Sequence, residues 1–226
     1  MDDTLAREAT PDQQGASTSN SKLKTQNSKL LAIRLAAHAG ALVPLAAMVW
    51  AFFTGGLSAN PIQDLTFRTG EAALVLLVLS LACTPVNRLL GWKPAQALRR
   101  PLGLYAFFYA ALHLLVFVVL DYGLDWSLIL ATVAEKRYVI AGFAAFLLLL
   151  PLAVTSTKGW QRRLGKRWSL LHRLVYLAAP LAVLHFALLV KADLREPLLF
   201  GAALALLLAT RLPPVRRALA RLRGTP

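Results

Sequence analysis

Long apolar runs separated by short polar segments make up most of the chain. Apolar residues dominate six runs, at about 31–53, 70–87, 102–121, 138–155, 169–190 and 197–212. A helix that crosses a bilayer needs about 20 such residues, and about 17 suffice. The last run, of about 16 residues, is therefore the weakest candidate. Because the runs are continuous and do not alternate, they favour helices over a β-barrel. The pattern predicts an all-α membrane protein whose six transmembrane helices form a bundle.

The segments at the two ends of the chain differ from these runs. Residues 1–28 are rich in Ser, Thr, Gln and Asn and lack an apolar period, so we expect a disordered cytoplasmic segment there. The run at 31–53 is not followed by the small-residue site of a cleaved signal peptide and is interpreted as a retained helix. Residues 29–212 then form the expected six-helix domain, and residues 213–226 form a basic cytoplasmic tail.

Basic residues gather on one side of the predicted membrane. Lys and Arg outnumber Asp and Glu by 25 to 11, in a chain that is 57% hydrophobic. Most of the basic residues fall in the N-terminal segment, the second and fourth loops and the C-terminal tail, while the other three loops hold most of the acidic ones. The positive-inside rule therefore places both termini in the cytoplasm. Because the charge lies between spanning runs, we expect membrane lipid around the chain and no nucleic-acid partner.

Four histidines are the candidates for chemistry inside the membrane. His38, His113, His172 and His185 all lie within or just inside apolar runs. An ionisable residue at membrane depth is a functional candidate, and imidazole is the usual axial ligand of haem iron. Cys83 stands alone and no Cys-x-x-Cys-His motif occurs, so neither a disulfide nor a thioether-linked haem is expected. We therefore expect b-type haem held by histidines. A lone membrane histidine can also simply bond a neighbouring helix, and this reading stays open, above all for His38.

His113 and His185 are predicted to lie at the same depth. His113 precedes Asp121 by eight residues, and His185 precedes Lys191 by six. The difference of two residues corresponds to about 3 Å along a helix. Both helices are expected to run from the inside to the outside. The two imidazoles can therefore clamp one iron in the outer leaflet.

The inner half of the membrane offers a less defined pair. His172 and His38 both lie close to the predicted cytoplasmic face. The 13 residues from His172 to His185 advance an ideal helix by about 1300°, which leaves the two side chains about 140° apart. Either a bend at Pro180 brings them into line, or each faces a different helix. The second option is compatible with a His38–His172 pair, which makes His38 a candidate inner ligand. Arg173 is a candidate partner of a haem propionate, or it reaches the lipid headgroups.

Two segments carry a family resemblance. They are RRPLGLYAFFYAALH, at residues 99–113, and GWQRRLGKRWSLLHRLVYLAAPLAVLHF, at residues 159–186. Together they closely resemble the MsrQ family (formerly YedZ), which belongs to the ferric-reductase-like transmembrane group. The resemblance covers about residues 30–212. It implies a haem-binding subunit of a methionine sulfoxide reductase system in the bacterial cell inner membrane.

The resemblance also implies ligands, cofactors and partners. The haem histidines of the family correspond to His113, His172 and His185, while His38 matches no family ligand. The implied cofactors are haem b and FMN, and no residue is assigned to FMN. Electrons are expected from the quinone pool or from a cytosolic flavin reductase. Their expected acceptor is a periplasmic molybdopterin reductase, MsrP, which forms a heterodimer with the membrane subunit and repairs oxidised periplasmic proteins.

Other functions leave different marks in a sequence. No G-x-G-x-x-G follows a strand, and no hydrolase grouping occurs, so the catalytic reductase is expected on a separate chain. One alternative is a cytochrome b-type subunit that serves another acceptor, such as ferric iron. The other is a non-redox transporter. Against the transporter, no repeat relates the two halves of the chain, and we expect no intramembrane acid of the kind that marks many proton relays.

Overall fold

The computed structural model describes residues 11–190, 193–215 and 217, with side chains described from residue 26 onward. No strand occurs among the described residues, and the expected all-α membrane fold is confirmed. The elements in chain order are α1 (Pro11–Thr54), α2 (Pro61–Leu90), α3 (Pro94–Leu115), the π-helical η1 (Val116–Asp121), α4 (Trp126–Glu135), α5 (Arg137–Val154), α6 (Lys158–Leu164), α7 (Lys166–Leu171), the 3₁₀-helical η2 (His172–Leu174), α8 (Val175–Leu189) and α9 (Arg195–Ala209).

The predicted count of six spans is not confirmed. Among the described residues, five helical stretches are long and apolar enough to cross a membrane: Gln26–Thr54, Pro61–Leu90, Pro94–Asp121, Arg137–Val154 and Lys166–Leu189. The sixth apolar run forms α9, whose 15 residues reach about 22 Å. The hydrocarbon core of a bilayer is about 30 Å thick. Charged residues set this length, because α9 begins at Arg195 and Arg211 follows its end.

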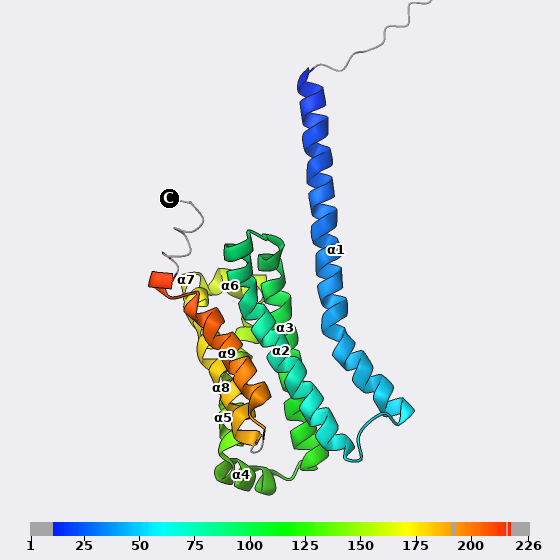
Figure 1. Cartoon of the computed structure of the whole chain (residues 1–226), viewed down its shortest axis with the longest axis vertical. Coiled ribbons are helices and arrows are strands. Elements are labelled where there is room, and N and C mark those ends of the chain that lie inside the picture. Colours follow the sequence, from blue (N-terminus) through cyan, green and yellow to red (C-terminus); the bar gives the residue numbers. More distant parts are fainter. Residues whose placement is uncertain (1–10, 191–192, 216, 218–226) are drawn as a thin grey trace, which may run out of the picture.

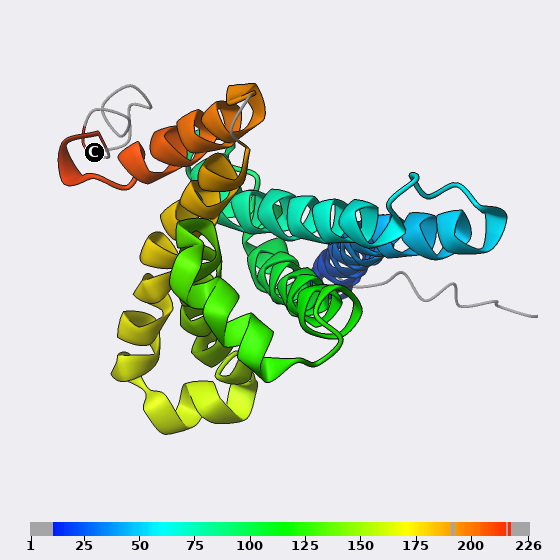
Figure 2. The same ribbon diagram turned by 90° about the horizontal axis from the view of Figure 1, so that it is seen from below.

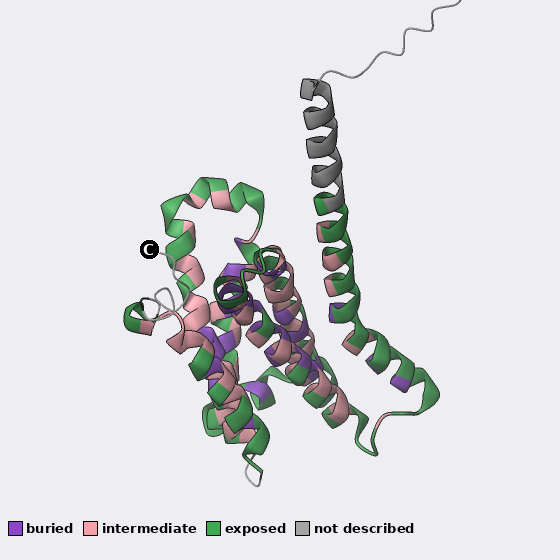
Figure 3. Cartoon of the chain, turned by 45° about the horizontal axis from the view of Figure 1, so that its top comes forward, coloured by how far each residue is buried: buried purple, intermediate pink, exposed green. Residues whose placement is uncertain are grey.

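The helices form a bundle with α1 at its side. Figures 1 and 2 show α2, α3, α5, α8 and α9 packed together, with α1 placed next to α2 and α3. The helices α1, α3 and α8 run in one direction, and α2, α5 and α9 run back. Buried residues gather between the bundle helices, whereas α1 is largely exposed (Figure 3). The start of α1 and the end of α9 lie toward the same end, as two termini on one membrane side require. Which side is cytoplasmic stays a prediction.

Helices also occupy segments where the apolar pattern predicts none. The short helices α4 and α6 close opposite ends of the bundle in segments expected to be loops (Figure 1). α1 begins at Pro11 and so includes residues 11–28, where disorder is expected, while residues 1–10 lie outside the described residues. Extending a helix that already exists avoids the cost of nucleation, so polar residues can continue it without an apolar face. Of the predicted tail 213–226, residues 213–215 and 217 are described, and they are helical.

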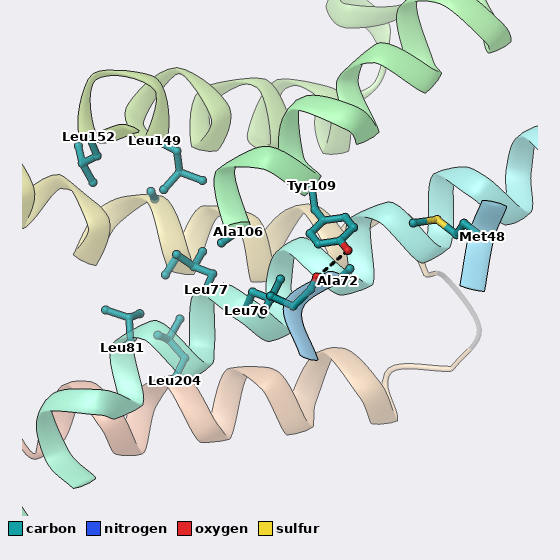
Figure 4. Packing of buried hydrophobic residues seen from close by; sticks show 13 residues of the cluster. Met48, Ala72, Leu76, Leu77, Leu81, Ala106, Tyr109, Leu149, Leu152 and Leu204 are labelled. Atoms are coloured by element: carbon teal, nitrogen blue, oxygen red, sulfur yellow. Dashed lines mark hydrogen bonds between the residues drawn. The ribbon is translucent and has the colours of Figure 1, made fainter. Parts of the chain in front are cut away.

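α1 is joined to the bundle beside its internal proline. Pro44 has no N–H and therefore interrupts the hydrogen-bond ladder of α1. At the adjacent rung, the Tyr109 hydroxyl of α3 donates to the carbonyl of Ala41 at 2.7 Å and accepts from the N–H of Leu45 at 3.0 Å. Tyr109 is completely buried, and Figure 4 shows its hydroxyl directed at α1. A side chain inserted into a helix ladder is a known cause of bending, and Figure 1 shows that α1 bends.

α2 begins earlier than the apolar pattern predicts. The pattern starts this run at residue 70, but the helix starts at Pro61, with Asn60 as its N-cap. The spanning stretch therefore contains Asp64 and Arg68, in addition to Glu71, which already lies inside the apolar run. The expectation that intramembrane acids are absent is wrong. Asp64 and Arg68 form an ion pair at 2.8 Å, and this pair together with the capped start allows charged residues in the first turns of a membrane helix.

Candidate functional site

The structure brings His113 and His185 together between α3 and α8. His113 lies near the end of α3 and His185 near the end of α8. Their ring centroids are 6.0 Å apart, and the ring planes stand at 85° to each other. These two helices run in the same direction (Figure 1). Both imidazoles are half-buried. The depth comparison from the sequence thus predicts the approach of the two rings, while their role as ligands stays a prediction.

Each of these rings is held in the same way by a neighbouring helix. His113 Nδ1 lies 2.9 Å from the carbonyl oxygen of Thr66 on α2. His185 Nδ1 lies 2.6 Å from the carbonyl oxygen of Tyr138 on α5. A carbonyl oxygen only accepts, so each Nδ1 carries the proton and donates it. The other nitrogen, Nε2, then has its lone pair available for a metal, which is the arrangement that metal-binding histidines commonly show.

A glycine lies beside each ring, one helical turn after the carbonyl that binds it. Gly70 follows Thr66 by four residues, and Gly142 follows Tyr138 by four. A Cβ atom at Gly70 would lie 3.1 Å from His113 Nδ1, and one at Gly142 would lie 2.6 Å from His185 Nδ1. Real Cβ atoms essentially never approach closer than 3.0 Å. Each carbonyl with its glycine is called a glycine seat below. A side chain at Gly142 would force His185 to move, and one at Gly70 would require His113 to shift by a few tenths of an ångström.

The spacing of the rings fits a haem iron between them. An imidazole nitrogen binds a metal at about 2 Å, so two rings on opposite sides of one ion have centroids about 6 Å apart. The observed 6.0 Å agrees with this value. Among the described residues, no group of three or more His, Cys, Asp and Glu side chains gathers to hold a bare metal ion. Two imidazoles from two helices are one of the ligand sets by which proteins hold haem iron.

His172 lies outside this pair, with its own set of contacts. Its Nδ1 bonds the carbonyl of Trp168 at 3.0 Å, and its ring lies 4.0 Å from the Trp168 ring, centroid to centroid. Trp168 is fixed in turn by a 2.9 Å bond from its indole N–H to the carbonyl of Thr155. His172 Nε2 is buried and makes no hydrogen bond of ordinary geometry among the described residues, although the backbone of Leu152 lies near enough to act on this ring. A buried nitrogen without a partner costs about 1–3 kcal/mol. This nitrogen therefore fits a metal ligand as well.

The helix that carries His172 and His185 is not a uniform α-helix. The three residues from His172 to Leu174 form a 3₁₀ turn. A 3₁₀ helix advances about 120° per residue where an α-helix advances about 100°, so this turn adds about 60° of rotation. The two histidines are then about 80° apart around the axis, where an ideal helix separates them by about 140°. The predicted bend at Pro180 is thus not the only source of rotation.

His38 contacts a tyrosine of α3, and Arg173 is exposed, as its alternative role at the lipid headgroups allows. His38 Nδ1 is 3.0 Å from the hydroxyl of Tyr105 on α3, in an exposed contact. Among the described residues no contact joins His38 to His172, so that predicted pair has no structural support. The guanidinium of Arg211 is the one that reaches inward, bonding Tyr176 Oη at 2.6 Å and the carbonyl of Leu81 at 2.8 Å.

Several of these residues are missed by sequence reasoning. Gly70, Gly142 and Tyr138 hold the histidines, and Arg211 joins α9 to two other helices. The two glycines leave a signal, since a glycine inside a membrane run marks a close approach between helices. Arg211 leaves none, because an arginine just after an apolar run looks like an ordinary headgroup contact. The charge of Arg99 acts on both His172 and Arg211, so positive charges gather at this end of the bundle.

The chain is similar to several named proteins. Residues 69–183 match the family described as "Ferric reductase like transmembrane component". A protein of Rhodospirillum rubrum named "Protein-methionine-sulfoxide reductase heme-binding subunit MsrQ" is 54% identical over 189 residues, which cover 81% of this chain and 89% of the relative. Relatives of the same name from Xanthomonas axonopodis pv. citri and Xanthomonas euvesicatoria pv. vesicatoria are 45% identical over 83% and 90% of this chain, and over 88% and 96% of their own lengths. No solved structure matches the chain.

Proposed function

We propose, from the premise that this chain belongs to the MsrQ family of ferric-reductase-like transmembrane proteins, that it is the haem-binding, electron-carrying membrane subunit of a protein-methionine-sulfoxide reductase system. Relatives at 45–54% identity confirm the family resemblance that the two sequence segments indicate. The observation that carries the proposal is the pair of imidazoles 6.0 Å apart, each held through Nδ1 by a glycine seat.

The chain's own residues would hold one haem b between α3 and α8. His113 and His185 would supply the axial nitrogens, and the carbonyls of Thr66 and Tyr138 fix the tautomer and the plane of each ring. When bound, haem supplies one-electron oxidation and reduction at its iron. The apolar surroundings keep water away. Phe107 on α3 and Phe146 on α5 stack with their ring centroids 5.5 Å apart, which adds an apolar contact between these two helices.

A second haem at the other end of the bundle follows from His172. Its buried Nε2 makes no hydrogen bond of ordinary geometry among the described residues, and positive charges gather around it. Arginines bind carboxylates well through paired N–H groups. The fixed and half-buried Arg211 therefore suits a haem propionate better than the exposed Arg173. The second axial ligand of this haem has no assigned residue, and His38 stays a candidate. The FMN implied by the family has no assigned residue either and takes no part in the proposal.

The electron donor and acceptor complete the proposed function. Electrons would enter from the quinone pool, or from a cytosolic flavin reductase, and leave to a periplasmic molybdopterin reductase of the MsrP type that pairs with this chain. That partner would reduce methionine sulfoxide in oxidised proteins. The proposed location is the bacterial inner membrane. The names of the relatives support this, since they describe a haem-binding subunit of a protein-methionine-sulfoxide reductase.

The proposal is tested by the spectrum of the purified protein. Protein expressed with adequate haem should show the reduced-minus-oxidised bands of b-type haem, and a protein without those bands contradicts the proposal. His113→Ala and His185→Ala should each remove the same haem, whereas His38→Ala, which changes a candidate ligand of the other haem only, should leave this one bound. An unchanged spectrum in both variants refutes the pair as ligands. Oxidation of the reduced haem by ferric citrate, but not by a purified MsrP-type reductase, would instead favour the ferric-iron alternative.

A further inference from the structure

α2 presents a carboxylate within the membrane that the haem site does not use. Glu71 is exposed on a helix that spans the membrane, three residues after Arg68. Arg68 bonds Asp64 at 2.8 Å, and its charge also attracts Glu71. A carboxylate at membrane depth is costly and usually marks a functional site. Glu71 is therefore a candidate functional residue outside the haem site.

Glu71 and Arg68 stand at one end of a groove between α1 and α2. The groove has a volume of about 550 Å³, within the range of about 300–1,000 Å³ that small-molecule sites occupy. Small residues of α1, such as Gly40 and Ala47, form one wall. Apolar residues of α2, such as Val75 and Leu79, form the other. The groove is thus polar at one end, apolar along its length, and bordered by helices that face the bilayer.

α2 separates this groove from His113 by the width of one helix. At about 100° per residue, the residues that contact His113 share one face of α2, and those that line the groove lie about half a turn away. The first set is Thr66, Thr69 and Gly70, and the second includes Arg68, Ala72, Val75 and Leu79. A helix with its side chains is about 10–12 Å across. A molecule in the groove is therefore separated from His113 by about the width of α2. The Thr66 carbonyl, on the opposite face of this helix, accepts the hydrogen bond from His113 Nδ1.

We propose that the α1–α2 groove binds an isoprenoid quinol, with the ring at Arg68 and Glu71 and the isoprenoid chain along the apolar walls. This inference rests on the proposed function, because it needs a redox centre at His113. The single polar end suits a small ring with two hydroxyls on a long apolar tail. A phospholipid has the same overall shape, but nothing in its chemistry uses a position beside a redox centre.

The proposed reaction is balanced in electrons and protons. The quinol loses two electrons and two protons and becomes a quinone. Haem held by His113 would accept one electron at a time, so two one-electron transfers would consume one quinol. The Glu71 carboxylate accepts a hydroxyl proton and releases it to water at the membrane surface, and the second proton follows by the same route. Arg68, held by Asp64, orients the other hydroxyl or the quinone carbonyl that forms from it.

The test uses the full haem-loaded chain in detergent and decylubiquinol as the probe. A Cβ at Gly40 would meet no atom within 4 Å, so Gly40→Leu fills the groove without a clash in α1. Ala46→Leu adds the same bulk at an exposed position of α1 that does not line the groove. Two quantities are measured: the rate of haem reduction by decylubiquinol, and the amount of quinone that copurifies with each variant and is extracted with solvent. Haem content is measured separately by reduction with dithionite.

Gly40→Leu should slow quinol-driven reduction by at least about 10-fold and lower the copurified quinone, with haem content unchanged. Ala46→Leu should change neither. Glu71→Gln should slow reduction by about 100-fold while quinone is retained, because only the proton acceptor is lost. If Gly40→Leu and Glu71→Gln both reduce haem with decylubiquinol at the wild-type rate, the proposed groove site is wrong. It is also wrong if Gly40→Leu loses copurified phospholipid while its copurified quinone is unchanged. Absence of haem from the wild-type protein contradicts the proposed function itself, and the two failures are thus distinct.

Discussion

The glycine seat of His185 allows a graded test of how the proposed outer haem is held. A Cβ at Gly142 would lie 2.6 Å from His185 Nδ1, about 0.8 Å inside the 3.4 Å at which ordinary contact begins. In Gly142→Ala the imidazole must move away and give up its 2.6 Å bond to the Tyr138 carbonyl. Overpacking costs about 1–3 kcal/mol, and a lost hydrogen bond costs about 1 kcal/mol. The sum of about 2–4 kcal/mol corresponds to haem affinity about 30- to 1,000-fold lower.

Two further variants set the scale for this measurement. Gly70→Ala brings a Cβ to 3.1 Å from His113 Nδ1, so its effect should be smaller than that of Gly142→Ala. Gly201→Ala, on α9, brings a Cβ to an ordinary 3.7 Å from Val183 and should leave haem binding unchanged. Alanine is the better helix former by about 1 kcal/mol, so a loss of haem cannot come from a weaker helix. Haem per protein is measured by its pyridine complex, and circular dichroism checks the fold. Full haem occupancy and an unshifted haem spectrum in Gly142→Ala would refute the seat.

Two more predictions concern the contacts that support the site. Tyr109→Phe leaves the Leu45 N–H and the Ala41 carbonyl without their buried partner, so the free energy of unfolding should fall by about 1–3 kcal/mol and protease should cut α1 faster. Tyr105→Phe, at an exposed contact, should change both quantities less, and equal protease sensitivity in the two variants would contradict this attachment of α1. Trp168→Phe keeps an aromatic ring against His172 but loses the indole bond to Thr155, which should lower the stability measured by thermal unfolding by about 1 kcal/mol. Trp160→Phe, at an exposed position, is the control, and identical unfolding midpoints for the two variants would show that the bond contributes nothing.

The features that depend on position along a helix could be predicted from the sequence. The apolar runs predict the spanning helices, and counting from the charged loops brings His113 and His185 to one depth, where the structure has them 6.0 Å apart. Helix pitch is nearly constant, so depth follows from residue number. The count of six spans depended on a run near the minimum length, and α9 is the helix where it is not confirmed.

The features that depend on rotation and on neighbouring helices could not be predicted. The 3₁₀ turn at His172 changes the phase of the helix without any proline at that point. The start of α2 could not be predicted because the Asp64–Arg68 pair lowers the average hydropathy of its first turns. The bonds of Tyr109 to α1 join residues more than sixty positions apart. Such contacts arise from packing between helices, on which the periodicity of a single run carries no information.

The order of the glycine seats along the chain bears on how the protein is made. Gly70 precedes His113, and Gly142 precedes His185, so a ribosome completes each seat before the histidine that occupies it. The members of each couple also belong to the two most closely packed helix pairs, α2 with α3 and α5 with α8. Each half of the molecule can therefore orient its own imidazole as it enters the membrane. A haem bound between them would act as the last cross-link, joining two halves that have already taken shape.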